Sequence, residues 1–231
     1  EIEADIKNIV TEMYNVDENT IVTASKYLSE SIDNYTYYSI LSDIFLKMGN
    51  IYSEDVKKIG LAIEMINIVL ESIRNLPQFC DNNYDKNNRA SVHYIFGETI
   101  SELTLISYIC SSFNLIIDSI QSMKDKNIIE ENKYFNVMEI SIERMCNNIS
   151  LIEEKDFQDK EINSLLDNNF NSGKKGEIIN KFINEKKKYL FELSILIPYI
   201  IYRDQDKEEE ISILAKKITD LYYNKNDSNL E

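Results

Sequence analysis

The sequence has few residues that interrupt helices. Its 231 residues include 5 glycines, 2 prolines and no tryptophan. So few turn-forming residues leave little room for an interdomain linker. Hydrophobic residues make up 43% of the chain, which argues against disorder, and they recur at spacings of three and four over long stretches. We therefore expect a single all-α domain over residues 1–231.

Cysteine is also scarce. Cys80, Cys110 and Cys146 lie far apart and form no C-x-x-C pair, so neither a zinc site nor a disulfide framework is expected. We expect buried free thiols and a reducing compartment, without a choice between the cytoplasm and an organelle matrix such as that of a mitochondrion or plastid.

Basic residues are too few to balance the acidic ones. Lys and Arg number 25 against 40 Asp and Glu, and the net charge is −15. This charge repels nucleic acid and anionic membranes, so no nucleic-acid partner is expected. The longest predicted helix, Ala90–Met123, has an apolar segment that is interrupted by Ser107, Asn114 and Asp118. We interpret it as a core or subunit-contact helix and expect no transmembrane segment.

The apolar periodicity predicts the helices. They are expected over Ile2–Tyr14, Thr20–Ser31, Tyr35–Met48, Ser53–Ile73, Ala90–Met123, Ile128–Ile152, Ile162–Leu166, Glu177–Tyr202 and a last helix after Asp206. Leu76–Asn88 is predicted to be a loop because it contains a proline among clustered Asn and Asp residues.

Three segments carry a resemblance to a known family. They are Ala62-Ile63-Glu64-Met65-Ile66, Arg74-Asn75-Leu76-Pro77-Gln78-Phe79-Cys80-Asp81-Asn82-Asn83, and His93-Tyr94-Ile95-Phe96-Gly97-Glu98. Their order resembles the trans-isoprenyl diphosphate synthases of the farnesyl, geranylgeranyl and polyprenyl type. In that family an A-I-E-M-I helix precedes a D-D-L-P-x-M-D-N-D motif, R-R-G-x-P-x-x-H and F-G-E. The resemblance implies an isoprenoid synthase-like helical bundle, shortened at its C-terminal end.

The resemblance also shows where the chemistry of that family is missing. Arg74 and Asn75 stand at the paired aspartates of the first motif, and the remnants of the two acidic clusters are Asp81, Asp85 and Asp220. Magnesium requires near-octahedral oxygen ligation, which isolated carboxylates supply poorly. We therefore expect no bound metal, no cofactor and no catalytic residue. Arg74 would then be free to neutralise Asp81 or Asp220.

Some cationic positions of the family are retained. Lys86 stands at one arginine of R-R-G, His93 at the histidine, and Lys186 at the lysine of K-T-G-x-L-F-E; Lys217 is a further cation. The resemblance implies that these are remnants of a substrate site, whereas Lys186 is otherwise part of a solvent-facing patch. Asp33–Ser39, which replaces the diphosphate-binding G-G-K-R-x-R-P, contains no cation.

These features favour one hypothesis over two others. The leading one is a non-catalytic subunit that binds an active prenyl diphosphate synthase and stabilises or regulates it, as in heteromeric polyprenyl synthases; a homodimer is also allowed. The first alternative is a divergent prenyltransferase that uses Mg²⁺ to condense isopentenyl diphosphate with an allylic diphosphate. The second is a helical scaffold recruited into an unrelated complex.

Overall fold

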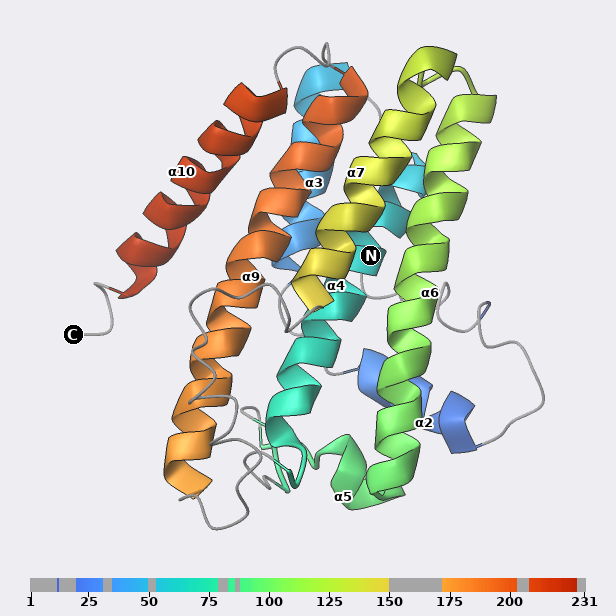
Figure 1. Cartoon of the computed structure of the whole chain (residues 1–231). Helices are drawn as coiled ribbons and strands as arrows, with labels where there is room; N and C mark the ends of the chain where they lie inside the picture. The colour runs from blue at the N-terminus through green and yellow to red at the C-terminus, as the bar shows by residue number, and fades with distance from the viewer. Residues whose placement is uncertain are drawn as a thin grey trace. The chain divides into compact units, whose positions relative to one another are not determined.

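The described part of the chain is built from helices. The computed structural model describes residue 12 and residues 20–30, 35–49, 53–78, 83–85, 88–149, 172–202 and 208–227. The helices in it are α2 (Thr20–Ser29), α3 (Thr36–Gly49), α4 (Glu54–Asn75), α5 (Val92–Phe96), α6 (Glu98–Asp125), α7 (Glu131–Ile149), α9 (Ser172–Tyr202) and α10 (Glu208–Asp227) (Figure 1). The predicted all-α fold class is confirmed.

The chain divides into two compact units. Unit 1 comprises Glu1–Asn34, Met65–Ser111 and Ser150–Lys186, and unit 2 comprises Tyr35–Glu64, Ser112–Ile149 and Lys187–Glu231. Helices α4, α6 and α9 each contribute one segment to either unit. The single domain expected from the sequence stays a prediction.

Most helix boundaries lie within a few residues of the predicted ones. Helix α9 begins at Ser172, five residues before the predicted Glu177, and α7 begins three residues after the predicted Ile128. The predicted helices Ile2–Tyr14 and Ile162–Leu166 lie outside the described residues, apart from the helical residue Glu12.

In unit 1, aromatic side chains hold α2 against α5 and α6. The Tyr108 hydroxyl donates a hydrogen bond of 2.6 Å to the carbonyl oxygen of Ser25. The rings of Tyr27 and Phe96 meet edge to face with centroids 5.8 Å apart. Because Tyr108 is fully buried, its hydroxyl needs this partner, and the pair fixes α2 on α6.

In unit 2, the N-terminal segment of α4 packs closely against α3. Tyr38, Leu41 and Phe45 of α3 are buried, as predicted from their spacing. A Cβ atom at Gly60 of α4 would lie 2.7 Å from the Tyr38 ring, so the absence of a side chain permits this approach. Lys126, after α6, forms a 2.6 Å ion pair with the buried carboxylate of Asp55.

The predicted continuous helix Ala90–Met123 is wrong. It is divided into α5 and α6 by Gly97, whose φ of 82° lies in the left-handed region that favours glycine. The Gly97 N–H still donates 2.9 Å to the carbonyl oxygen of His93 and closes α5. The direction of the chain therefore changes within the F-G-E segment.

Helix α6 has apolar residues on its exposed side as well as its buried side. Tyr108 and Ile116 are buried, whereas Leu103, Ile106 and Cys110 are exposed. Among the described helices, one is long and apolar enough to cross a membrane, judged by length and composition alone, and this helix is α6. Inside the protein, 39% of its most apolar stretch is buried.

The expectation of buried thiols is wrong for two of the three cysteines. Cys110 of α6 and Cys146 of α7 are both free and exposed, because each lies on the outer side of its helix. Cys80 lies outside the described residues.

Candidate functional site

The end of α4 in unit 1 carries an ion pair formed by Arg74, which the motif resemblance aligned with one of the paired aspartates. The Arg74 guanidinium lies 2.6 Å from the Glu71 carboxylate, one helical turn earlier, and both side chains are about one-fifth exposed (23% and 18%). Asn75, the next residue, is buried. The sequence hypothesis that paired Arg74 with Asp81 or Asp220 did not consider Glu71, which is close enough on the same helix to satisfy the guanidinium.

Asp85 belongs to a tight turn in the loop that follows. Its carboxylate accepts a hydrogen bond of 2.9 Å from the Arg89 backbone N–H, and its own N–H donates 2.8 Å to the Arg89 carbonyl oxygen. Asn88, at the glycine of R-R-G, has a φ of 61°, a conformation that asparagine tolerates better than most residues. Asp85 thus stabilises the turn, while Asp81 and Lys86 lie outside the described residues.

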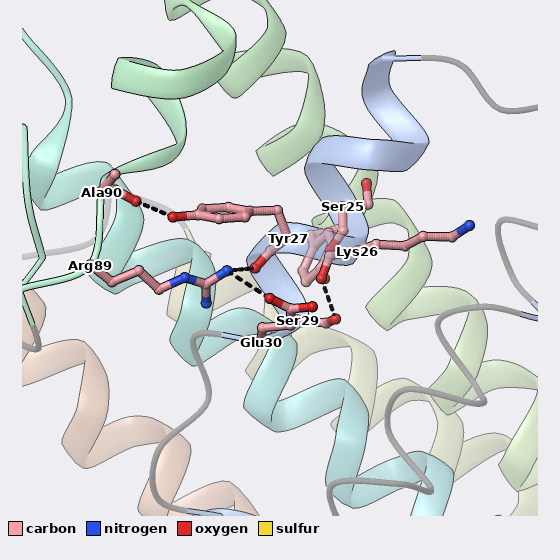
Figure 2. Close-up of polar contacts among 8 residues, drawn as sticks. Ser25, Lys26, Tyr27, Ser29, Glu30, Arg89 and Ala90 are labelled. Carbon is pink, nitrogen blue, oxygen red and sulfur yellow. Dashed lines mark hydrogen bonds and ion pairs between the residues drawn. The ribbon is translucent and has the colours of Figure 1, made fainter.

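The turn positions a cation that sequence reasoning missed. The Arg89 guanidinium stacks 3.8 Å from the centre of the Tyr27 ring, donates to the carbonyl oxygen of Tyr27, and contacts the Glu30 carboxylate at 3.2 Å (Figure 2). The Tyr27 hydroxyl donates 2.7 Å to the carbonyl oxygen of Ala90. This network ties α2 to the loop through a cation that directly follows the R-R-G-like segment.

His93 lies in the short helix α5 and is half-buried. Its Nδ1 atom is 3.0 Å from the hydroxyl oxygen of Ser91, which is itself buried. In the same unit, the Gln78 side-chain amide donates to the carboxylates of Glu98 at 2.9 Å and Glu102 at 3.2 Å, and so joins the start of the loop after α4 to α6. The contact with Ser91 gives His93 a local structural setting.

Lys186 is buried, so the solvent-facing interpretation of this residue is wrong. Its side chain is 1% exposed, and its ammonium group lies 5.3 Å from the centre of the Phe182 ring on the preceding turn of α9. A lysine removed from water in this way needs interactions that offset its lost hydration. A second buried lysine, Lys175, lies three turns earlier on the same helix.

In unit 2, the motif residue Glu64 is fully buried and caps α3. Its Oε1 atom accepts hydrogen bonds from the backbone N–H groups of Tyr37 at 2.9 Å and Tyr38 at 3.2 Å. The first N–H groups of a helix have no partner within the helix and favour a negative charge. Glu64, the glutamate of the A-I-E-M-I segment, therefore binds the free N–H groups at the start of α3. By the motif resemblance, this part of the chain stands in place of the diphosphate-binding G-G-K-R-x-R-P segment.

Lys217 and Asp220 are both exposed on α10 in unit 2. Glu192 of α9 interacts electrostatically with Asp220 and Lys216 of α10 and with Arg144 of α7. Burial raises the pKa of the Glu192 carboxyl above its ordinary 4.5, Lys216 and Arg144 oppose this shift, and Asp220 adds to it. Sequence reasoning missed this group, although Glu192 ends the segment that is similar to K-T-G-x-L-F-E.

Aromatic side chains surround the end of α10. The Phe191 ring lies 4.6 Å from that of Tyr222 and 6.0 Å from that of Tyr223, measured between centroids. The Tyr223 and Tyr37 hydroxyl oxygens are 3.5 Å apart, and burial raises the pKa of Tyr223 above its ordinary value. These contacts hold the C-terminal part of α10 against α9 and α3.

The predicted site residues are divided between the units. Arg74, Asn75, Asp85, His93 and Lys186 belong to unit 1, and Lys217 and Asp220 belong to unit 2. Among the residues whose placement is described, no group of three or more His, Cys, Asp or Glu residues could hold a metal ion.

Solved structures share this arrangement of helices. An isoprenoid synthase family member from Thermotoga neapolitana matches with a TM-score of 0.62 and 15% identity, over 99% of this chain and 78% of its own. An FPP/GFPP synthase from Zymomonas mobilis matches with a TM-score of 0.64 and 14% identity, over 94% and 74%. The chain has the isoprenoid synthase fold. A geranyltranstransferase from Thermotoga maritima also matches, with a TM-score of 0.60 and 15% identity over 98% and 76%.

At sequence identities of 14–15%, the similarity to these solved structures shows a shared fold and does not show a shared activity. No protein-family model matches the sequence, and no curated protein matches it. The fold implied by the motif resemblance is therefore confirmed, and the activity is a separate question.

Proposed function

We propose that this chain is a non-catalytic subunit that binds an active trans-prenyl diphosphate synthase and stabilises or regulates it. The observation that carries the proposal is the Arg74–Glu71 ion pair at the end of α4. If the motif resemblance aligns Arg74 correctly, its guanidinium stands where the resembled family has magnesium-binding aspartates, and a fixed positive charge disfavours a divalent cation by direct repulsion. The proteins with matching structures are named as prenyl-transferring enzymes, which supplies the isoprenoid context.

The start of α3 supports the same proposal. A diphosphate at this helix would need free N–H donors or cationic side chains, as anion sites at helix N-termini generally do. Glu64 engages the N–H groups of Tyr37 and Tyr38, and no cation lies between Asp33 and Ser39. A carboxylate directed at the same donors would repel the substrate phosphates.

The loop after α4 also supports the proposal of a non-catalytic subunit. Asp85, the acidic remnant that the structure describes there, uses its carboxylate to close the turn with Arg89. Losing oriented electrostatic stabilisation typically costs ~3 kcal/mol or more of transition-state free energy per group. Several such losses together would leave no useful prenyl-transfer rate.

The proposal is tested by isolating the chain from its native source. We expect a prenyl diphosphate synthase with intact aspartate motifs to co-purify. The chain alone, incubated with labelled isopentenyl and allylic diphosphates and Mg²⁺, should form no elongated product. Elongation by the purified chain would establish the divergent-enzyme alternative instead.

Arg74 can be tested directly with matched variants. The Arg74→Asp variant removes the cation and adds a carboxylate, and Arg74→Ala removes the cation alone. We expect both to lose stability because the ion pair with Glu71 is lost, and neither to bind Mg²⁺ in calorimetry. A gain of Mg²⁺ affinity in Arg74→Asp without loss of stability would contradict the structural role of the pair.

Lys186 distinguishes the proposed subunit from a scaffold with an unrelated role. Binding of inorganic pyrophosphate in the presence of a chelator, weakened at least about tenfold in Lys186→Met, would indicate a retained diphosphate subsite. Methionine suits this variant because it fills a buried position with little change in volume and removes the charge. The absence of pyrophosphate binding would favour the unrelated-scaffold alternative.

A further inference from the structure

Two tyrosine rings of unit 1 lie against each other where the loop after α4 meets α5. The centroids of the Tyr84 and Tyr94 rings are 5.9 Å apart, and the planes of the two rings are inclined by 42°. The two side chains are 52% and 56% exposed, respectively. The proposed function gives this pair of tyrosines no role.

The backbone holds both tyrosines in place through Ser91. The N–H of Ser91 donates 2.8 Å to the carbonyl oxygen of Asn83, the residue before Tyr84, and the carbonyl oxygen of Ser91 accepts 3.1 Å from the N–H of Tyr94. Tyr84 also forms a β-bridge with Ala90. Backbone hydrogen bonds therefore bring the two residues together, and the closeness of the rings does not depend on their hydroxyl groups.

We propose that Tyr84 and Tyr94 form a site of oxidative modification, at which a one-electron oxidant couples the two rings into dityrosine. Each phenol loses one electron to the oxidant and its hydroxyl proton to water, which leaves two phenoxyl radicals. The radicals join through one ring carbon next to each oxygen, and the hydrogens on these carbons move to the oxygens. In total the chain gains one C–C bond and loses two electrons and two protons.

The closeness of the rings favours coupling within one chain. Two reactants that are held side by side react as if they were present at very high concentration, whereas radicals on separate chains must meet by diffusion. Separate chains also repel each other through their net charge of −15. The reaction needs no free surface for docking, since only an electron and a proton leave each ring.

A second tyrosine pair, in unit 2, is less suited to coupling. The Tyr222 and Tyr223 rings have centroids 5.4 Å apart, but they meet edge to face at 76°. Burial raises the pKa of Tyr223, and its hydroxyl oxygen lies 3.5 Å from that of Tyr37. A phenol that holds its proton more tightly is harder to convert into a neutral radical. We therefore expect coupling of Tyr84 with Tyr94 to dominate.

This inference goes beyond the proposed function and is tested on the purified full chain without a partner synthase. The oxidant is photoexcited tris(bipyridine)ruthenium(II) with persulfate as the electron acceptor, and its positive charge suits a chain with a net charge of −15. An equal mixture of normal and heavy-nitrogen chains is oxidised, digested with trypsin and analysed by mass spectrometry. Cleavage after Lys86 and Arg89 separates the two tyrosines unless they are coupled.

We expect a cross-linked peptide that contains Tyr84 and Tyr94, is lighter by two hydrogen atoms than the two separate peptides together, and has both halves from the same chain. The inference is overturned if no peptide joins Tyr84 to Tyr94, or if the joined peptide combines normal and heavy halves.

Tyr84→Phe and Tyr94→Phe test the same site by dityrosine fluorescence, because phenylalanine keeps the ring but has no hydroxyl proton to lose. Each variant should lower the fluorescence at least about fivefold. Tyr222→Phe is the matched control, since it also removes a partly exposed tyrosine from a close pair, and it should leave the fluorescence within about twofold of the original. Circular dichroism checks that each variant is helical. An equal loss of fluorescence in all three variants would also overturn the inference.

Discussion

At the scale of single residues, Glu64 combines a motif position with a structural task. Its carboxylate is fully buried and accepts both N–H hydrogen bonds at the start of α3. Glu64→Ala should leave two buried donors without their acceptor and lower the free energy of unfolding by about 2–4 kcal/mol. Urea denaturation measures this loss. Glu64→Gln keeps an acceptor oxygen and should cost less; an equal loss in both variants would mean that the charge, rather than the acceptor, is needed.

A substitution at Gly60 tests the contact between α3 and α4 by adding atoms instead of removing them. A Cβ atom there would lie 2.7 Å from the Tyr38 ring and 3.2 Å from its Cα atom. Alanine normally stabilises a helix relative to glycine, but overpacking should reverse the sign and destabilise Gly60→Ala by about 1–3 kcal/mol. Thermal melting of G60A and of G60A/Y38L provides the check, because a smaller side chain at Tyr38 should recover part of the loss. Purely additive effects would contradict the contact.

At the scale of elements, the electrostatic interactions of Glu192 with Arg144, Lys216 and Asp220 join α7, α9 and α10 within unit 2. Burial raises the pKa of Glu192, so the folded protein holds this proton more tightly than the unfolded chain does. The resulting stabilisation is complete below the ordinary value of 4.5 and is lost as the pH rises through the raised pKa. Glu192→Gln cannot ionise and should therefore be more stable than the original chain near pH 7, with the difference vanishing towards pH 4.

Urea midpoints measured from pH 4 to pH 8 test the Glu192 prediction. Asp220→Asn is a useful comparison, because removing the nearby carboxylate should lower the pKa of Glu192 and move the transition to lower pH. If Glu192→Gln is less stable than the original chain at pH 7, the attraction to Lys216 and Arg144 outweighs the cost of burial.

The helices could be predicted from periodicity, but their breaks and exposed sides could not. The apolar stripe of α4, including Val56, Ile59 and Ile63, is buried as its spacing predicts. The break at Gly97 was missed because a single glycine is compatible with a continuous helical pattern, and a positive φ leaves no trace in the sequence. The exposure of Cys110 was missed because α6 is apolar on both sides.

The candidate site shows the same division. That Arg74 and Asn75 stand at the aspartates of the family motif is a prediction from the order of the motifs, and it stays a prediction. The partner of Arg74 could not be predicted, because Glu71 lies outside every motif and competes through helix geometry alone. Arg89 was missed because its contacts with Tyr27 and Glu30 join residues about sixty positions apart.

At the scale of the whole molecule, the net charge of −15 opposes folding of the chain. Mutual repulsion of like charges destabilises a compact state and is screened by salt. Raising NaCl from about 10 mM to about 200 mM, which shortens the Debye length from ~30 Å to under 10 Å, should therefore stabilise the chain. We expect the melting temperature to rise by about 2–4 °C, equivalent to about 1 kcal/mol for a chain of this size.

The opposite outcome would identify a different balance of charges. Salt also weakens local ion pairs, among them Lys126–Asp55, whose carboxylate is 5% exposed, and Arg74–Glu71. Partly buried pairs are screened less than fully exposed charges, so their loss should not cancel the relief of repulsion. The prediction is contradicted if added salt lowers the melting temperature of both the original chain and Lys126→Ala. The weakened ion pairs would then be others than Lys126–Asp55, and their loss would outweigh the relief of repulsion.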